Sequence, residues 1–283
     1  MHFDRFELGS DLRHVVRHVW LVRWDLPAGF IQRQRVLSYP AFNAVFEPGA
    51  GSAASGPHVP RAGSAASGPH APGGCALYPP LAHVQIRELE GASWAVGLLL
   101  RPGVGVMLSP TPRAVAPEGE PLNGTPAVRV CGLLTDWSPG SRSALVSTLR
   151  GWLTPLVDQV DDVARLVNSA CDSAENDRDL LRAADLADTV GVSPRTLERA
   201  VRERLGVTPK WLIECRRMQE AATTLFAQPD TDVSALAADL GFTDYPHFSR
   251  SYRRIIGETP KQTAAAVTAA SRVSPRRSAS ARQ

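Results

Sequence analysis

The chain has 283 residues, of which 43% are hydrophobic and 21% are charged, and its formal net charge is +3. This length exceeds one typical domain of about 100 to 200 residues, so two domains joined by a linker are expected. No apolar run approaches the roughly 20 residues that cross a bilayer, and residues 1–13 lack the pattern of a secretory signal. We therefore expect a cytoplasmic protein without a membrane role.

The first part of the chain has the composition of β-strands. Residues 36–46, 83–88 and 93–100 are rich in β-branched, aromatic or alternating apolar residues and are bounded by Gly and Pro. We predict a mostly β domain over residues 1–140. The stretch 101–106 contains a Gly-x-Gly, but the third glycine and the helical pattern of a dinucleotide site are missing, so no nucleotide fold is predicted.

A short motif occurs twice inside this domain, at Ala50–Pro60 and Ala62–Pro72. Its Gly, Ser, Ala and Pro content cannot offset the entropy of ordering, so we predict a flexible surface loop over residues 50–73. His58 and His70 recur with the motif, but two histidines in a flexible loop make a poor metal site.

The four cysteines give no sign of a metal centre. They are far apart in the sequence, form no C-x-x-C pair and have no histidine cluster beside them. We predict reduced, mostly buried thiols, with no metal and no cofactor. The residues are Cys75, Cys131, Cys171 and Cys215.

From residue 141 onward, proline and glycine become rarer and apolar residues fall at helical spacing, as in Leu145, Leu149 and Leu153. We predict a helical linker region over residues 141–179. The polar stretch Asp172–Asp179 is interpreted as a hinge before the last domain.

Two segments of the C-terminal part, Ala184–Pro209 and Ser234–Pro260, align with one another. Each predicts a short amphipathic helix, a turn at Gly191 or Gly241, and a second helix. Ser193 can cap the second helix of the first copy, and either Thr243 or Asp244 can cap that of the second. An all-α domain with two helix-turn-helix units is therefore expected over residues 180–265, giving an α+β protein of two domains.

The outer faces of these second helices are polar and largely basic. Arginine can bind guanine O6 and N7 with two hydrogen bonds, as a recognition helix in the major groove requires. A solvated surface would explain either face alone, but the repetition of turn, cap and basic helix favours DNA recognition. The candidate DNA-binding residues are Arg195, Thr196, Glu198, Arg199, Arg202, Tyr245, Pro246, His247, Ser249, Arg250 and Arg253.

This last third resembles the DNA-binding domain of the AraC/XylS family of transcriptional regulators. The motifs that carry the resemblance are Gly-Val-Ser-Pro-Arg-Thr-Leu-Glu-Arg, Leu-Gly-Val-Thr-Pro, and Leu-Gly-Phe-Thr-Asp followed by Phe-Ser-Arg. The resemblance implies a linking helix over about Pro209–Phe226, with Arg217 and Ala221. One subunit would then read two major-groove segments about 34 Å apart. Val201 departs from the family, which often has an aromatic residue there, as at Tyr252.

The front part resembles a poorly characterised N-terminal domain found in a subset of these regulators. The matching stretches are residues 35–40, 43–48 and 94–103. The resemblance implies a β barrel that binds an effector or mediates dimerisation. Candidate effector-binding residues are Phe46, Trp94 and Arg101, with core packing and an ion pair as the alternatives. The implied partners are double-stranded DNA, a small-molecule effector, a second copy in a homodimer and RNA polymerase, at the nucleoid.

Two other functions would account for parts of this sequence. A DNA-repair alkyltransferase fused to the same module would need clustered cysteines, one of them activated, so we expect no enzyme. A DNA-binding protein whose front domain only dimerises stays open. Residues 266–283 predict a disordered basic tail that adds salt-sensitive attraction to DNA, or a plain solvated end.

Overall fold

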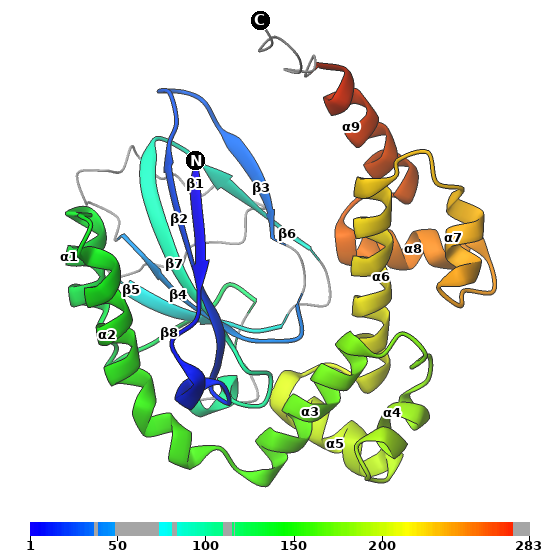
Figure 1. Ribbon diagram of the computed structural model, residues 1–283, viewed down its shortest axis with the longest axis horizontal. Coiled ribbons are helices and arrows are strands. Elements are labelled where there is room, and N and C mark those ends of the chain that lie inside the picture. The colour runs from blue at the N-terminus through cyan, green and yellow to red at the C-terminus, as the bar shows by residue number, and fades with distance from the viewer. Residues whose placement is uncertain (37–38, 49–73, 81–83, 110–114, 116, 274–283) are drawn as a thin grey trace, which may run out of the picture.

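The computed structural model describes residues 1–36, 39–48, 74–80, 84–109, 115 and 117–273. A sheet-rich N-terminal part lies beside a helical C-terminal part (Figure 1), so the predicted order of a mostly β domain and an all-α domain is confirmed. The duplicated loop predicted at residues 50–73 lies outside the described residues. Among those that are described, no helix is long and apolar enough to span a bilayer.

The N-terminal domain is built on a six-stranded antiparallel sheet with the strand order β1-β2-β7-β4-β5-β8. Its strands are β1 (His2–Phe6), β2 (Val16–Asp25), β4 (Asn43–Glu47), β5 (Gly74–Tyr78), β7 (Ala92–Leu100) and β8 (Glu120–Pro121). Two further strands, β3 (Gln32–Val36) and β6 (Gln85–Leu89), form a separate antiparallel ribbon. The predicted strands at 83–88 and 93–100 correspond to β6 and β7. The single strand predicted at 36–46 instead spans the last residue of β3 and most of β4, which are separate strands.

The β-barrel closure implied by the family resemblance is wrong for the described part of the domain. In the ladder, β1 pairs only with β2, and β8 pairs only with β5, so the sheet stays open between its two edge strands. The reason is that β8 is only a two-residue strand and the ribbon of β3 and β6 forms its own sheet.

The longest pairing in the sheet joins β2 to β7 and runs from Val16 opposite Leu100 to Asp25 opposite Ala92. One face is covered by α1 (Ala127–Thr135) and α2 (Ser141–Leu153), as Figure 1 shows. Apolar residues of α2 are spaced so that one stripe is fully buried, and Trp152 stacks edge-on against Phe46 at 5.7 Å between ring centroids. The helical spacing read from Leu145, Leu149 and Leu153 therefore marks this layer of the core.

The region between the two domains is helical over most of its length. A 3-10 turn (Thr154–Gln159) follows α2, and α3 (Asp162–Asn176) begins at Asp161, whose carboxylate accepts a hydrogen bond from Ala164 N at 2.7 Å. The hinge predicted at Asp172–Asp179 is wrong for its first half, because α3 continues through Asn176. Burial of Cys171 and Ala174 holds this end of the helix in the core.

The Gly-x-Gly of residues 101–106 has a packing role. Gly103 N donates a hydrogen bond to Asn168 Oδ1 at 2.9 Å, and a Cβ at Gly103 would lie 2.5 Å from Ala164 O in α3. Likewise, a Cβ at Gly105 would lie 2.2 Å from the Phe42 ring. The missing side chains let this segment of the N-terminal domain contact α3 backbone to backbone.

The C-terminal domain consists of α4 (Ala183–Thr189), α5 (Pro194–Leu205), α6 (Pro209–Ala227), α7 (Val233–Asp239), α8 (Tyr245–Ile256) and α9 (Pro260–Val273). The disordered tail predicted over 266–283 is wrong for residues 266–273, which complete α9. Alanines dominate that stretch and favour a helix. Residues 274–283 lie outside the described part of the chain.

Replacing Gly103 by valine should lower the free energy of unfolding by about 1 to 3 kcal/mol, because the added side chain overlaps the α3 backbone. Denaturant unfolding followed by circular dichroism measures this. Gly151→Ala is the matched control, since Gly151 lies in α2 with open space around it and should gain up to about 1 kcal/mol. Equal stability of the valine variant and the parent would contradict the close contact.

The free energy of unfolding should also fall as the pH is lowered, because of His18. Burial and the neighbouring positive charges of Arg5 and Arg17 lower the pKa of His18 from 6.5 to about 4. Between these values the unfolded chain takes up a proton that the folded chain does not, so the free energy of unfolding falls as the pH falls from 6.5 to 4. The carboxyl groups of Asp11 and Asp161 have pKa values lowered from 3.8 and contribute only below this window.

Urea titrations at pH 7.5 and 5.0 test this, with His18→Gln as the comparison. The variant should lose most of the difference between the two pH values. A difference that persists undiminished in the variant would assign the effect to another group.

Candidate nucleic-acid interface

The first helix-turn-helix unit is α4 followed by α5. Leu186 is fully buried in α4, and Gly191 ends that helix with φ 73°, a left-handed conformation that suits glycine. Ser193 then caps α5, because its hydroxyl accepts a hydrogen bond from Thr196 N at 3.1 Å, and Pro194 is the first helical residue. The predicted turn and cap are thus confirmed.

The second unit, α7 followed by α8, repeats this arrangement. Gly241 has φ 74°, and Asp244 caps α8 by accepting a hydrogen bond from His247 N at 2.7 Å. The choice left open by the sequence is thereby decided: Thr243 instead contacts the Asp244 carboxylate at 3.3 Å. Both second helices end at a left-handed glycine, Gly206 or Gly257.

The long helix α6 joins the units and fixes their relation. Its apolar residues are buried over most of its length, and the helix passes between the two units in Figure 1. The Arg216 guanidinium bonds Glu220 at 3.0 Å and the carbonyl oxygens of Arg178 and Leu180 at 3.3 Å each. Arg217 lies 3.8 Å above the ring of Phe242, just after the turn of the second unit. Two adjacent arginines thus tie α6 to the segment before α4 and to the turn between α7 and α8.

The candidate DNA-binding residues lie on the outer faces of α5 and α8. Seven are exposed and four are half-buried at the rim of the core. The exposed residues are Arg195, Arg199, Arg202, Pro246, His247, Arg250 and Arg253; the half-buried ones are Thr196, Glu198, Tyr245 and Ser249. Opposite faces hold Leu197 and Val201, or Phe248 and Tyr252, all with no exposed surface. The apolar stripe of each helix therefore directs its basic stripe outward.

Not every basic side chain on these helices is available to a ligand. Glu198 and Arg202 form an ion pair at 2.5 Å along α5, while Arg204 and Arg254 are tied to Asp161 and Glu214 at 2.5 Å and 2.6 Å. Within the described residues, no carboxylate pairs with Arg195, Arg199, Arg250 or Arg253. These four arginines are free to meet an anionic partner.

One basic residue beside this face was missed by sequence reasoning. Lys261, at the start of α9, is exposed and lies 5.9 Å from the ring centroid of Tyr245, the first residue of α8. It follows the second unit in the chain, so a search restricted to the repeated motif does not include it. The signal that could have identified Lys261 is its position directly after Pro260, the last residue of the repeated motif.

The candidate effector residues do not form a site of their own. Phe46 is fully buried, Trp94 is 5% exposed, and the Arg101 guanidinium pairs with Asp172 of α3. The aromatics are core residues of the sheet, and Arg101 joins the two domains.

The thiols lie in surroundings opposite to those of a reactive cysteine. Burial raises the pKa of all four, that of Cys131 to about 11 and that of Cys215 to about 12. Nucleophilic cysteines need a lowered pKa. Among the described residues, no group of three or more His, Cys, Asp or Glu side chains is placed to hold a metal ion.

Residues 186–266 match the family described as a helix-turn-helix domain, and residues 5–115 match a domain of unknown function (DUF6597). The activator RhaS of Pectobacterium carotovorum is 34% identical over 76 residues, and the regulator VirS of Mycobacterium tuberculosis is 39% identical over 80. The C-terminal domain belongs to the AraC/XylS family.

The matches to these two relatives are short. The match to RhaS covers 27% of each chain, and that to VirS covers 28% of this chain and 23% of VirS. The chain thus spans about a quarter of the length of the curated relatives it matches. A solved transcriptional regulator with an AraC-type DNA-binding domain, from Chromobacterium violaceum, is 33% identical, with a TM-score of 0.32. Its alignment covers 36% of this chain and 90% of that one.

Removing either helix cap should destabilise the AraC/XylS domain. Ser193→Ala and Asp244→Ala each leave an unpaired backbone N–H in a first turn and should cost about 0.5 to 2 kcal/mol. Thr243→Ala is the matched control, since its hydroxyl caps no backbone group, and it should change the free energy of unfolding by less than about 0.5 kcal/mol. Chemical denaturation measures all three, and equal losses at Thr243 and Asp244 would argue against the assigned cap.

Proposed function

We propose that the chain is a sequence-specific, DNA-binding transcriptional regulator in which α5 and α8 enter adjacent segments of the major groove. The observation that carries this proposal is the repeated pair of capped helices, each with unpaired arginines on its outer face and both held by α6. A single arginine can read guanine through two hydrogen bonds. The one helix that separates the two units suits two DNA segments about one helical turn apart.

Individual roles can be assigned by chemistry. Arg199 and Arg250, which occupy equivalent positions of the two units, would read base edges. Lys261 and the backbone N–H groups at the helix starts would bind phosphates. Glu198 would orient the Arg202 side chain through the ion pair between them. The N-terminal domain would modulate the DNA-binding domain through a ligand or through dimerisation; the homodimer and a contact with RNA polymerase stay predictions.

The first experiment is selection of bound fragments from a random DNA library at near-physiological salt, followed by affinity measurements on the selected site. A motif of two blocks about one helical turn apart is expected. Weak binding without any motif would contradict a sequence-specific regulator.

On that site, Arg199→Ala and Arg250→Ala should each weaken specific binding by about 1 to 3 kcal/mol and relax the preference for one block. Lys261→Ala should weaken all sequences alike and reduce the salt dependence by about one phosphate contact. Arg129→Ala is the matched control, since it removes the same charge from an exposed position on α1. Unchanged affinity and preference on replacing Arg199 or Arg250 would exclude that residue from base reading.

A further inference from the structure

Lysine is rare in this chain and occurs at two equivalent places. The sequence holds 31 lysine and arginine residues together, and Lys210 and Lys261 are the only lysines. Each is the last residue of a repeated motif, Gly-x-Thr-Pro-Lys, at Gly206–Lys210 and Gly257–Lys261. Because the chain otherwise uses arginine for its basic residues, a lysine at the same point of both helix-turn-helix units indicates a shared role.

The structure gives the two motifs the same local geometry. The glycine ends α5 or α8 in a left-handed conformation, with φ 71° in the first unit and 93° in the second. The threonine then caps the next helix: Thr208 Oγ1 accepts a hydrogen bond from Trp211 N at 3.1 Å, and Thr259 Oγ1 accepts one from Gln262 N at 3.3 Å. Each lysine is therefore the second residue of the helix that follows a basic helix, α6 or α9.

The position of each lysine is unfavourable for its own helix. The helix dipole disfavours a positive charge in a first turn, and neither α6 nor α9 has an acidic residue there to offset it. The lysines therefore do not serve the stability of these helices.

The lysine charges are also left without partners inside the protein. The carboxylates closest to them in sequence are engaged elsewhere, since Glu214 pairs with Arg254 at 2.6 Å and Glu258 accepts a hydrogen bond from Thr263 at 2.7 Å. Both lysines are exposed, and within the described residues neither has a carboxylate partner. Each ammonium is available to an anion from outside.

Lys261 lies beside the start of its basic helix. α9 packs against α8, where the Tyr252 hydroxyl donates a hydrogen bond to Thr263 Oγ1 at 2.9 Å. The Lys261 ammonium lies 5.9 Å from the ring centroid of Tyr245, the first residue of α8. The charge thus flanks the end of the helix that would enter the groove, without belonging to that helix.

We propose that Lys210 and Lys261 bind one DNA phosphate each, as a matched pair that holds the two basic helices in register on the duplex. This inference rests on the proposed function and adds to it a second anchor, Lys210 in the first unit. A lysine ammonium is a flexible point charge that suits a phosphate oxygen, whereas the planar guanidinium of arginine suits the paired acceptors of guanine. The lysines would position the protein, and the arginines of α5 and α8 would specify the sequence.

The test measures the dissociation constant of the full-length protein for the selected DNA site at several salt concentrations. Each phosphate contact in duplex DNA contributes about 0.9 to the slope of the logarithm of affinity against the logarithm of salt concentration. Lys210→Gln and Lys261→Gln should each reduce that slope by about 0.9, and the double variant by about 1.8, with the base preference unchanged. A parental slope in either single variant would overturn the pair.

Matched variants separate a local contact from the net charge. Lys210→Arg and Lys261→Arg keep the charge and should keep the slope. Arg129→Gln removes the same charge from an exposed position on α1 and should leave the slope unchanged. Thermal unfolding checks that all variants remain folded. A loss in Arg129→Gln as large as that in the lysine variants would show that only net charge matters, and would overturn the two contacts.

A second readout uses the presence of only two lysines in the sequence. Sulfosuccinimidyl acetate acetylates exposed amines, and mass spectrometry of peptides gives the extent of reaction at Lys210 and at Lys261 separately. The bound duplex should slow the acetylation of both. An unchanged rate at either lysine would exclude that lysine from the contact with DNA.

The same salt titrations on a duplex of arbitrary sequence distinguish this inference from the proposed function. If the protein selects no DNA motif but both glutamine variants reduce the slope on the arbitrary duplex, the sequence-specific function fails and the phosphate contacts stand. If a motif is selected and the lysine variants keep the parental slope, the pair fails alone.

Discussion

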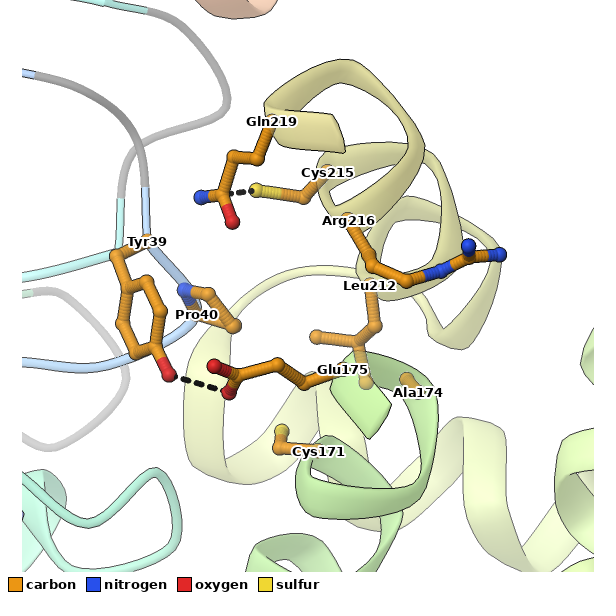
Figure 2. A pocket seen from close by; sticks show the side chains of 9 residues that line it. All are labelled: Tyr39, Pro40, Cys171, Ala174, Glu175, Leu212, Cys215, Arg216 and Gln219. Carbon is orange, nitrogen blue, oxygen red and sulfur yellow. Dashed lines mark hydrogen bonds between the residues drawn. The ribbon is translucent and has the colours of Figure 1, made fainter. Parts of the chain in front are cut away.

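The arrangement of the two domains depends on one half-buried carboxylate, that of Glu175 in α3. It accepts hydrogen bonds from both terminal nitrogens of Arg17 in β2, at 2.5 Å and 2.6 Å, and from the Tyr39 hydroxyl at 2.6 Å. Figure 2 shows Tyr39 and Glu175 pointing toward one another from the two sides of the junction. The cavity that Tyr39 and Pro40 line together with side chains of α3 and α6 measures about 10 Å³, room for no more than one water molecule. A two-pronged arginine with a tyrosine fixes direction as well as distance.

Because α3 also packs against α5 and α6, this network relates the sheet to the DNA-binding helices through a single rigid element. Asp172 and Asn168 add contacts to Arg101 and Gly103 on the same face of α3. A helix that carries the polar contacts of one domain and the apolar contacts of the other cannot turn without breaking one set. The interdomain geometry is thereby set by side chains that lie far apart in the sequence.

That separation explains what the sequence could and could not predict. Local signals sufficed for the helix-turn-helix units, because Gly191, Ser193 and their counterparts act on neighbouring residues. The open sheet was missed because closure depends on which strands pair, and the short β8 gives no local sign of its partner. The sequence leaves a pocket role and an ion pair both open for Arg101, since its partner Asp172 lies in α3 and no motif links the two residues.

The N-terminal domain reaches both units at equivalent points. Gly206, which ends α5, lines a hollow together with Phe42 and Pro79 of the N-terminal domain, and a Cβ at Gly257, which ends α8, would lie 2.5 Å from Val84. These two glycines occupy the same position in the repeat, so the sheet domain contacts the trailing end of each basic helix. The leading ends, with Arg195 and His247, face away from such contacts and remain exposed. Each basic helix is therefore positioned by α6 and by the N-terminal domain together, because α6 packs against both helices and the N-terminal domain meets their trailing ends.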